Sequence, residues 1–264
     1  MTRLLHVSDL HFGRHSLPEP VAAIEGLIQR ERFDAVVVSG DLSQRARMRE
    51  FARARDFLDL AAQVSPVLAV PGNHDCAWWR APLHLAPPAW MFRKWRRGLG
   101  RPEQSVLRIA GATIVGLNSA HGISRHTLTT RPRDLSVIGD LRPAQIAWAQ
   151  QEFAASPARD TRIIVMHHNP VAGEISQRFG LSNHRDVLEA FAQLGVSLVL
   201  CGHDHQEDVR AVEHPAQRVQ VAVAGTITTR TRGGRPPAIN VVALDGPAPR
   251  VQHLVWDPGT RTFR

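Results

Sequence analysis

Five short apolar runs, each ending in a group of polar side chains, constrain this chain more than any other feature of its sequence. The runs cover residues 3–8, 35–38, 67–70, 163–166 and 198–201. Helical patterns are predicted between them, over residues 20–32, 46–62, 143–155 and 184–194. Near-continuous apolar runs of this length are typical of strands that are buried on both faces. The alternation of strand and helix therefore predicts an α/β fold.

The last part of the chain has a different pattern. Strand-like runs at 219–225, 238–244 and 251–256 are separated by turn residues, and no helical pattern lies between them. Residues 105–117 also alternate like a hairpin, with Gly111 at its turn. These segments predict additional strands that are connected without helices.

No repeat or linker divides the sequence, so we expect one domain over residues 1–264. The segment 76–104 is rich in Trp, Pro and Arg, and we expect an irregular loop or cap insertion there. A second irregular stretch is expected over 120–142, which is rich in Arg and Thr. Long loops inside a compact domain are commonly functional.

Composition narrows the class of protein. Hydrophobic residues make up 43% and charged residues 21% of the chain, which is ordinary for a globular protein. No apolar run reaches the ~20 residues that span a bilayer, and the N-terminus becomes polar too early for a signal peptide. The two cysteines make no disulfide framework. These features favour a cytoplasmic protein, and the net charge of +8 favours anionic partners.

Each apolar run ends in residues that can bind metal. The five motifs are SDLHFG with Asp9 and His11, SGDLSQ with Asp41, PGNHD with Asn73, His74 and Asp75, MHHNP with His167 and His168, and CGHDH with His203 and His205. In open α/β sheets, ligands gather outside the carboxyl ends of the strands, so the fold could bring all five motifs to one rim. In an extended chain, the two ligand residues of a D-x-H or H-x-H motif project to the same side, so both could bind one metal ion.

The donor types indicate two divalent cations. Carboxylate, imidazole and amide oxygen suit Mn, Fe, Zn or Co. The set is too large for one ion, and two-metal sites stabilise both the attacking and the leaving oxygen of an in-line displacement. Taken alone, each motif has an ordinary explanation: Gly-Asp after a strand is usually a turn, and a His pair can be a buried structural feature. Their joint appearance at five strand ends favours the metal centre.

In this order, the motifs resemble those of the calcineurin-like metallophosphoesterase superfamily, which run D-x-H, G-D, G-N-H-D/E, H and G-H-x-H. The match extends over residues 9–205 and is closest in pattern to bacterial cyclic-nucleotide phosphodiesterases. The resemblance implies a four-layered α/β/β/α sandwich with two mixed β-sheets. The tail 219–256 and the hairpin 105–117 would then supply much of the second sheet.

The resemblance also implies roles for the motif residues. One metal ion would be bound by Asp9, His11 and His205, with Asp41 bridging to a second ion. That second ion would be bound by Asn73, His167 and His203.

Four further residues receive roles near the substrate. His74 matches the family's histidine that contacts the phosphate and protonates the leaving oxygen, and Asp75 matches the carboxylate that orients it. His168 is expected beside the substrate but outside the metal ligands. Arg14, three residues after His11, could reach a substrate phosphate.

The expected reaction is hydrolysis of a small phosphodiester or cyclic nucleotide by in-line attack of a metal-bound hydroxide. Protein Ser/Thr phosphatases of the superfamily carry G-D-x-x-D and an Arg after Asn-His, whereas this chain has GDLSQR and Asp75. That difference argues against a protein phosphatase. The related phosphodiesterases usually have HHPP where this chain has HHNP, which leaves the substrate open.

Three alternatives remain at this point. A lipid-linked nucleotide-sugar pyrophosphate hydrolase would use the basic, aromatic segment 89–101 as a peripheral membrane contact. A DNA-processing nuclease would fit the basic charge, although nucleic acid is not the favoured partner. A degenerate scaffold would lack activity, which the complete ligand set argues against. The segment 89–101 could also be an entrance loop or the contact of a homodimer.

Overall fold

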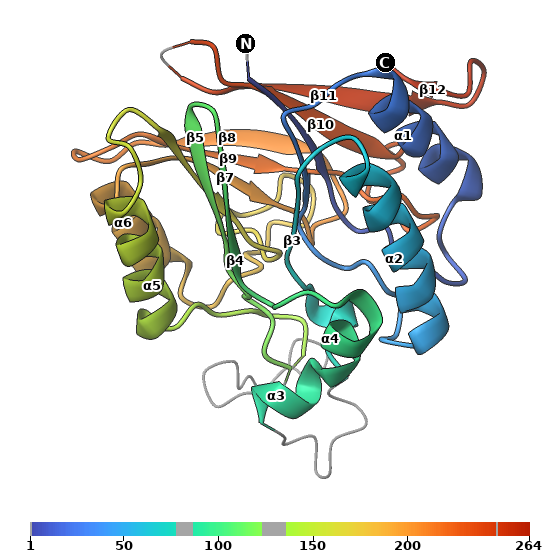
Figure 1. Cartoon of the computed structure of the whole chain (residues 1–264), viewed down its shortest axis with the longest axis horizontal. Helices are drawn as coiled ribbons and strands as arrows, with labels where there is room; N and C mark the ends of the chain where they lie inside the picture. The colour runs from blue at the N-terminus through green and yellow to red at the C-terminus, as the bar shows by residue number, and fades with distance from the viewer. Residues whose placement is uncertain (1, 78–86, 123–135, 247) are drawn as a thin grey trace.

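The computed structural model describes residues 2–77, 87–122, 136–246 and 248–264. In these residues the first sheet contains β1 (Arg3–Val7), β2 (Ala35–Val38), β3 (Val67–Ala69), β10 (Ala238–Ala243), β11 (Arg250–Asp257) and β12 (Thr262–Phe263). Their order across the sheet is β12-β11-β10-β1-β2-β3 (Figure 1). β1, β2 and β3 are parallel, and β10 pairs with β1 in the antiparallel sense.

The second sheet also has six strands in the described part of the chain. It contains β4 (Ser105–Ile109), β5 (Ala112–Gly116), β6 (Thr161–Val165), β7 (Val196–Cys201), β8 (Asp208–Val212) and β9 (Val219–Val223). The order is β4-β5-β6-β7-β9-β8, in which β5, β6, β7 and β9 are parallel and both edge strands are antiparallel to their neighbours.

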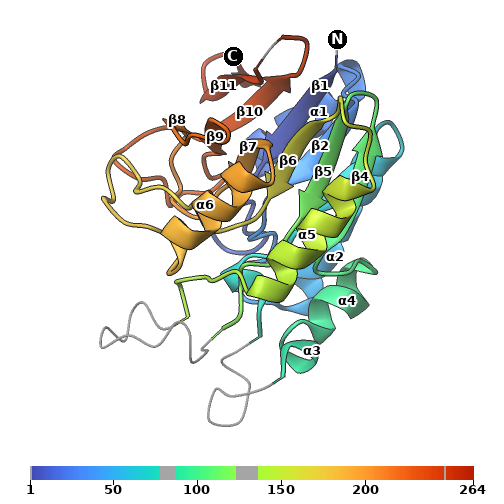
Figure 2. The ribbon, with the colours of Figure 1, turned by 90° about the vertical axis from the view of Figure 1, so that its left-hand side faces the viewer.

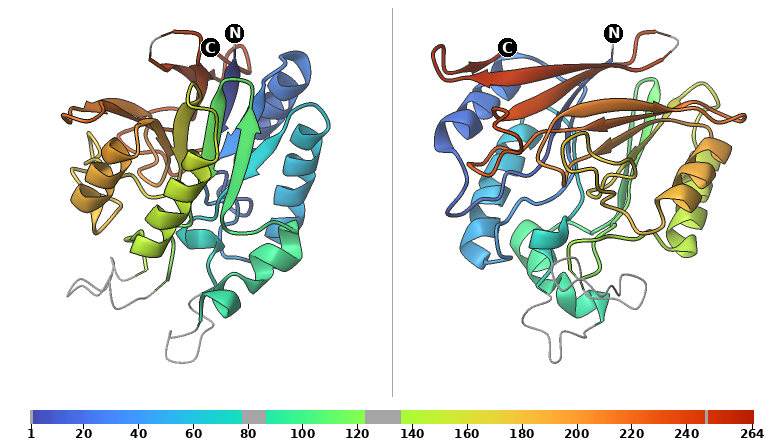
Figure 3. Two further views of the ribbon diagram at one scale, coloured as in Figure 1. Left: turned by 60° about the vertical axis from the view of Figure 1, so that its left-hand side comes forward. Right: turned by 180° about the vertical axis from the view of Figure 1, so that it is seen from behind.

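Helices cover the outer faces of both sheets. They are α1 (Pro18–Arg30), α2 (Met48–Ala62), α5 (Pro143–Ala154) and α6 (His184–Gln193). Two shorter helices, α3 (Pro88–Met91) and α4 (Arg93–Leu99), follow β3, and α4 packs against α2. Figures 2 and 3 show α1 and α2 on one side of the molecule and α5 and α6 on the other, with the two sheets between them. The predicted α/β/β/α sandwich with two mixed sheets is confirmed.

The strand β2 shows why its sequence is apolar throughout. Val36 and Val38 pack into the core beneath α1 and α2, whereas Ala35 and Val37 pack into the core between the two sheets. Successive side chains of a strand point to opposite faces, so a strand covered on both sides needs apolar residues at every position. All four residues are fully buried.

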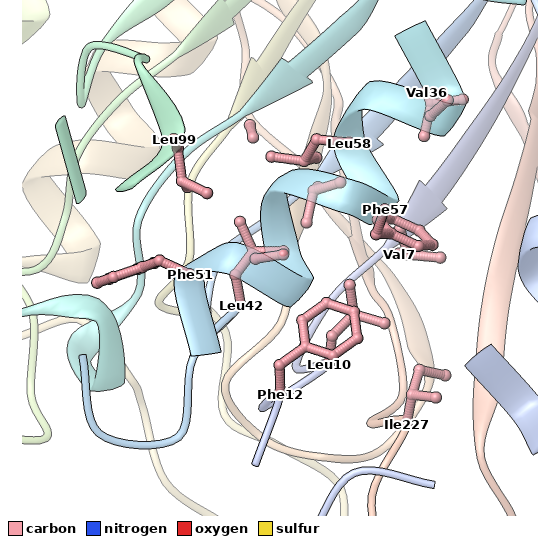
Figure 4. Packing of buried hydrophobic residues seen from close by; sticks show 14 of the residues in the cluster. Val7, Leu10, Phe12, Val36, Leu42, Phe51, Phe57, Leu58, Leu99 and Ile227 are labelled. Atoms are coloured by element: carbon pink, nitrogen blue, oxygen red, sulfur yellow. The ribbon is translucent and has the colours of Figure 1, made fainter. Parts of the chain in front are cut away.

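The apolar residues of α2 recur at helical spacing and form one side of the first core. Phe51, Phe57 and Leu58 are each at most 1% exposed. Figure 4 shows Phe57 beside Phe12, and the two ring centroids are 6.1 Å apart. Burying an aromatic side chain of this size stabilises the fold by about 1.5–3 kcal/mol. The helix is therefore held by its apolar face against the first sheet.

The assignment of the tail to the second sheet is wrong in part. Residues 219–223 and the hairpin strands do join the second sheet, but β10 and β11 complete the first sheet beside β1. One buried contact between β10 and β1 is polar: Nδ2 of Asn240 lies 3.1 Å from Nδ1 of His6. Both sheets offer apolar faces, so the apolar pattern of a strand does not identify its neighbour.

The segment 76–104 is more regular than expected, because its described part contains α3 and α4. Met91, Phe92 and Trp95 are at most 2% exposed. The Trp95 ring packs edge-on against Phe51, with centroids 6.3 Å apart, and a Cβ at Gly98 would overlap the Phe51 side chain.

The membrane contact predicted for residues 89–101 rested on apolar side chains, of which Met91, Phe92 and Trp95 belong to the core of the first sheet. Apolar side chains in a core cannot insert into a lipid surface at the same time. Trp90 is partly exposed, and the Arg93 guanidinium lies over its ring at 3.5 Å from the centroid. None of the helices in the described ranges is long and apolar enough to cross a bilayer.

We predict that Trp95→Ala lowers the free energy of unfolding by about 3–5 kcal/mol, because it leaves a cavity between α2 and α4. The change also removes the hydrogen bond from Nε1 of Trp95 to the Pro102 carbonyl oxygen. Urea denaturation followed by circular dichroism measures the loss. Trp90→Ala is the matched control and should cost about 1 kcal/mol, since it removes a partly exposed cation–π contact. Equal losses in the two variants would contradict this packing.

Candidate metal centre

The five motifs lie at the carboxyl ends of β1, β2, β3, β6 and β7. β1, β2 and β3 run parallel in one sheet, and β6 and β7 run parallel in the other. Donor atoms from both sheets come within 3.5 Å of one another, as the contacts of Asp41 show below. The site therefore forms where the strand ends of the two sheets meet.

The backbone at this rim is unusual. Five of the predicted ligands have positive φ angles: Asp9 (53°), His11 (42°), Asp41 (52°), His203 (72°) and His205 (57°). Such angles are uncommon outside glycine and cluster at functional sites. The extended geometry expected for D-x-H and H-x-H is therefore wrong. The side chains converge because left-handed residues turn the loops back over the strand ends.

The first donor set consists of Asp9, His11, Asp41 and His205. Nε2 of His205 lies 3.3 Å from Oδ1 of Asp9 and 3.2 Å from Nε2 of His11. Nε2 of His11 lies 3.5 Å from Oδ1 of Asp9 and 3.5 Å from Oδ2 of Asp41. These four donor atoms form a compact group, as the sequence predicted.

The second donor set is centred on His167. Its Nε2 lies 3.3 Å from Oδ2 of Asp41, 3.2 Å from Oδ1 of Asn73 and 3.3 Å from Nδ1 of His203. Oδ2 of Asp41 therefore faces both donor sets. This placement agrees with the predicted bridging position of Asp41, and Nε2 of His167 faces it as expected for the histidine chosen from the pair.

The donor sets fit divalent cations. Ligand atoms bound at about 2.0–2.2 Å around one ion lie roughly 3.0–3.5 Å apart, which is the spacing found here. Oδ1 of Asp9 is buried and accepts no hydrogen bond within the described residues. The ring of His167 is held through Nδ1 by the Ser39 carbonyl oxygen at 2.8 Å, which leaves Nε2 for a metal. His205 is held in the same way by the Arg230 carbonyl oxygen at 2.8 Å.

Charge at the site also suits cations. Burial raises the pKa of Asp41, but His167, His74 and His11 lower it more, so it stays well below its usual value. Burial lowers the pKa of His11 to about 4 and that of His203 to about 3, which keeps both imidazoles neutral. For His167, burial lowers the pKa, but Asp41 raises it to about 9. A cation at the second set would replace that proton.

His168 lies beside His167 and His203, and the three rings bring nitrogen atoms within 4.8 Å of one another. Its side chain is fully buried, and Nδ1 lies 2.8 Å from the Ser119 hydroxyl. Its ring packs against that of His203, with centroids 4.6 Å apart. Such complete burial does not support the predicted contact of His168 with substrate, and His168 is not among the described residues that line the cleft beside His74. His168 instead supports the positions of these two rings.

His74 faces the cleft, but Asp75 does not orient its ring. The carboxylate of Asp75 accepts hydrogen bonds from the amides of Leu42, Ser43 and Gly72 and from the Ser43 hydroxyl. This correction follows from the short 3₁₀ turn at Asn73–Asp75, which directs neighbouring side chains apart. Asp75 thus ties the loop after β2 to the loop after β3.

The ring of His74 is oriented by Gln44, which the sequence reasoning missed. Nδ1 of His74 donates to the main-chain carbonyl oxygen of Gln44 at 2.7 Å. The amide N–H of His74 donates to Oδ1 of Asp41 at 2.8 Å. The side-chain Nε2 of Gln44 also lies 3.2 Å from Nδ1 of His74. Gln44 is part of the motif SGDLSQ, so a signal was present in the sequence, but the shorter, main-chain contact has no residue-type signature.

A cleft of about 660 Å³ opens beside the second donor set. Asn73 and His74 line its inner end, and Arg14 lies on its wall as expected. Arg14 is exposed, so its guanidinium is accessible to a bound anion. The cleft therefore contacts the second donor set through Asn73, and His74 lines it next to that ligand.

Comparison with known proteins agrees with this geometry. Residues 2–207 match the profile of the calcineurin-like phosphoesterase family. The chain belongs to this family. Phosphoesterases are hydrolases, and the family uses a dinuclear metal centre. Both statements are consistent with the two donor sets that share Asp41.

Two curated relatives are named as cyclic nucleotide phosphodiesterases. A probable cyclic nucleotide phosphodiesterase of Synechococcus sp. is 26% identical over 77% of this chain and 73% of its own length. A cAMP/cGMP dual specificity phosphodiesterase of Mycobacterium tuberculosis is 28% identical over 76% of this chain and 61% of its own length. The chain thus spans less than two thirds of the second relative.

The fold resembles that of a solved purple acid phosphatase from yellow lupin. The TM-score is 0.64 at 10% identity, and the match covers 96% of this chain and 51% of the phosphatase. At such low identity the likeness concerns the fold alone.

We predict that Asp41→Asn loses most of the bound metal, because Oδ2 of Asp41 faces both donor sets. His74→Ala should retain its metal, since no donor atom of either set is removed. Metal content after loading with Mn²⁺ and desalting, measured by inductively coupled plasma mass spectrometry, checks both. Equal metal loss in the two variants would contradict the separate positions of Asp41 and His74.

Proposed function

We propose that this protein is a phosphodiesterase that uses two divalent cations, drawn from Mn, Fe, Zn or Co, to hydrolyse cyclic nucleotides or other small phosphodiesters. The observation that carries the proposal is the carboxylate of Asp41. It is shared by two complete donor sets at the inner end of a cleft, with His74 beside them. The names of the two bacterial relatives support a diester substrate.

The protein groups divide the work of the reaction. Asp9, His11 and His205 would hold one cation, and Asn73, His167 and His203 the other, with Asp41 between them. When bound, such cations supply an activated water at neutral pH and offset charge on the phosphoryl oxygens. The chain itself binds and orients the phosphate, and it provides the group that protonates the leaving oxygen.

His74 is placed for that protonation. Its Nδ1–H is engaged with the Gln44 carbonyl oxygen, so Nε2 is the ring atom that can face a substrate. When the ring is protonated, Nε2 can give a proton to the leaving oxygen as the bond to phosphorus breaks. The hydrogen bond from its main chain to Asp41 keeps this ring at a fixed position relative to both donor sets.

The lipid-linked pyrophosphate hydrolase has less support than it had from sequence. Its membrane contact required exposed apolar side chains in 89–101, and Met91, Phe92 and Trp95 are buried. A nuclease activity would also use the basic cleft, so single-stranded DNA belongs in any substrate comparison.

We predict hydrolysis of bis(p-nitrophenyl) phosphate by the Mn²⁺-loaded protein, measured by release of p-nitrophenol. Removing the metal with EDTA and desalting should abolish activity, and adding Mn²⁺ should restore it. A parallel comparison of cyclic AMP, single-stranded DNA and p-nitrophenyl phosphate tests the diester preference. If no diester is hydrolysed with Mn, Fe, Zn or Co, the proposed function is wrong.

We further predict that His74→Ala lowers kcat by about 10²–10⁴-fold, as expected for loss of a general acid. Gln44→Ala should lower kcat by less than about tenfold, because its main-chain carbonyl still accepts the hydrogen bond from His74. Steady-state kinetics on bis(p-nitrophenyl) phosphate with saturating Mn²⁺ measures both. A loss in Gln44→Ala as large as that in His74→Ala would show that the side chain, rather than the main chain, positions the ring.

A further inference from the structure

The cleft beside His74 is strongly basic. Among its described lining residues, five are arginines and a single one is acidic, Glu50. The arginines are Arg14, Arg45, Arg47, Arg49 and Arg230. A single phosphodiester carries one negative charge, and the two cations of the proposed centre already offset it. The guanidinium groups therefore exceed what the reacting phosphate needs.

These arginines come from three separate segments that the fold brings together. Arg14 follows β1, Arg45 and Arg49 lie between β2 and the first turn of α2, and Arg230 follows β9. Nη2 of Arg230 lies 2.9 Å from Nε2 of His15. Burial, Arg230, Arg14 and Arg45 together lower the pKa of His15, which reports a positive field in this part of the cleft. Convergence from three segments indicates a shaped anion site rather than a solvated charge run.

The acidic residue of the cleft does not neutralise the arginines. Oε2 of Glu50 accepts hydrogen bonds from the amides of Arg45 and Arg47 at 2.8 and 3.2 Å. Nε of Arg47 is 3.9 Å from Oε1 of Glu50. Within the described residues, the guanidinium groups of Arg14, Arg45 and Arg49 form no ion pair with a carboxylate. They are available to a ligand.

We propose that the substrate carries a second phosphate on its leaving group, and that Arg14, Arg45 and Arg49 bind it. This inference rests on the proposed phosphodiesterase function. His74 lines the same cleft as the arginines. Because His74 protonates the leaving oxygen in the proposed reaction, the leaving group is the part of the substrate that extends among the arginines. A volume of about 660 Å³ accommodates a nucleotide-sized group.

The reaction itself is unchanged. A P–O bond forms to the oxygen of a water that releases one proton to solvent, the P–O bond to the leaving group breaks, and the leaving oxygen takes its proton from His74. A terminal second phosphate is bound but not transformed, whereas in a pyrophosphate the second phosphate itself carries the leaving oxygen. Guanidinium groups suit it because they pair with phosphate oxygens through two parallel hydrogen bonds. Two sources share this chemistry: a terminal phosphate elsewhere on the leaving group, or the second phosphate of a pyrophosphate.

Four substrates that share adenosine distinguish these sources. ApA has one diester and no other phosphate, pApA and ApAp add a terminal phosphate at either end, and AppA has a pyrophosphate. With the Mn²⁺-loaded protein, we expect kcat/KM to exceed that of ApA by about 10–100-fold for a substrate with the second phosphate. Preference for pApA or ApAp identifies a terminal phosphate, and preference for AppA alone identifies a pyrophosphate.

Equal kcat/KM for all four substrates, with turnover of bis(p-nitrophenyl) phosphate intact, would overturn this inference and leave the proposed function standing. Absence of turnover on every diester would instead count against the proposed function. The two results therefore distinguish an error in the assigned second phosphate from an error in the proposed phosphodiesterase function.

Variants locate the binding groups. In Arg14→Gln/Arg45→Gln, the ratio of kcat/KM for the preferred substrate over ApA should fall at least about fivefold, since two charge-assisted contacts are lost. Arg53→Gln is the matched control, because Arg53 is an exposed arginine of α2 that lies outside the cleft. An unchanged ratio in the double variant, or an equal fall in the control, would overturn the assignment.

Discussion

The site depends on the carboxylate of Asp41 more than on any other group. Its Oδ2 faces the imidazoles of His11 and His167, which come from different sheets, and its Oδ1 accepts the amide N–H of His74. In addition, the main-chain carbonyl of Asp41 accepts the amide N–H of His11. One residue thereby contacts both donor sets and fixes the main chain of His74 relative to them.

Keeping these polar groups together requires backbone that folds tightly over the strand ends. A Cβ at Gly72 would overlap the Asp41 side chain, and a Cβ at Gly202 would overlap Ser8 and Asp9. Non-glycine residues in left-handed conformations cost on the order of 1–3 kcal/mol each, so the surrounding core must hold them. The cores on both outer faces and between the sheets supply that rigidity. Strain at the rim is thus balanced by packing elsewhere.

The residues around the metal ligands act mainly through main-chain contacts. Carbonyl oxygens of Ser39, Gln44 and Arg230 each orient one imidazole ring of the site. The arginines of the cleft differ in kind, because their side chains are exposed and, within the described residues, Arg14, Arg45 and Arg49 form no ion pair with a carboxylate. The centre is therefore rigid and buried, whereas the surface that would select a substrate is open and charged. Changes in that surface can alter substrate preference without disturbing the donor sets.

The sequence by itself determined the α/β class, the five strand-end motifs and the residues of the two donor sets. It could do so because burial on both faces imposes continuous apolar runs, and because metal ligands are limited to a few residue types. Only the tertiary structure decided that β10 and β11 join the first sheet, that His168 is fully buried, and that Gln44 rather than Asp75 orients His74. Those outcomes depend on strand pairing, loop conformation and main-chain hydrogen bonds. Such interactions are made by groups that every residue carries, so the identity of the residues does not reveal them.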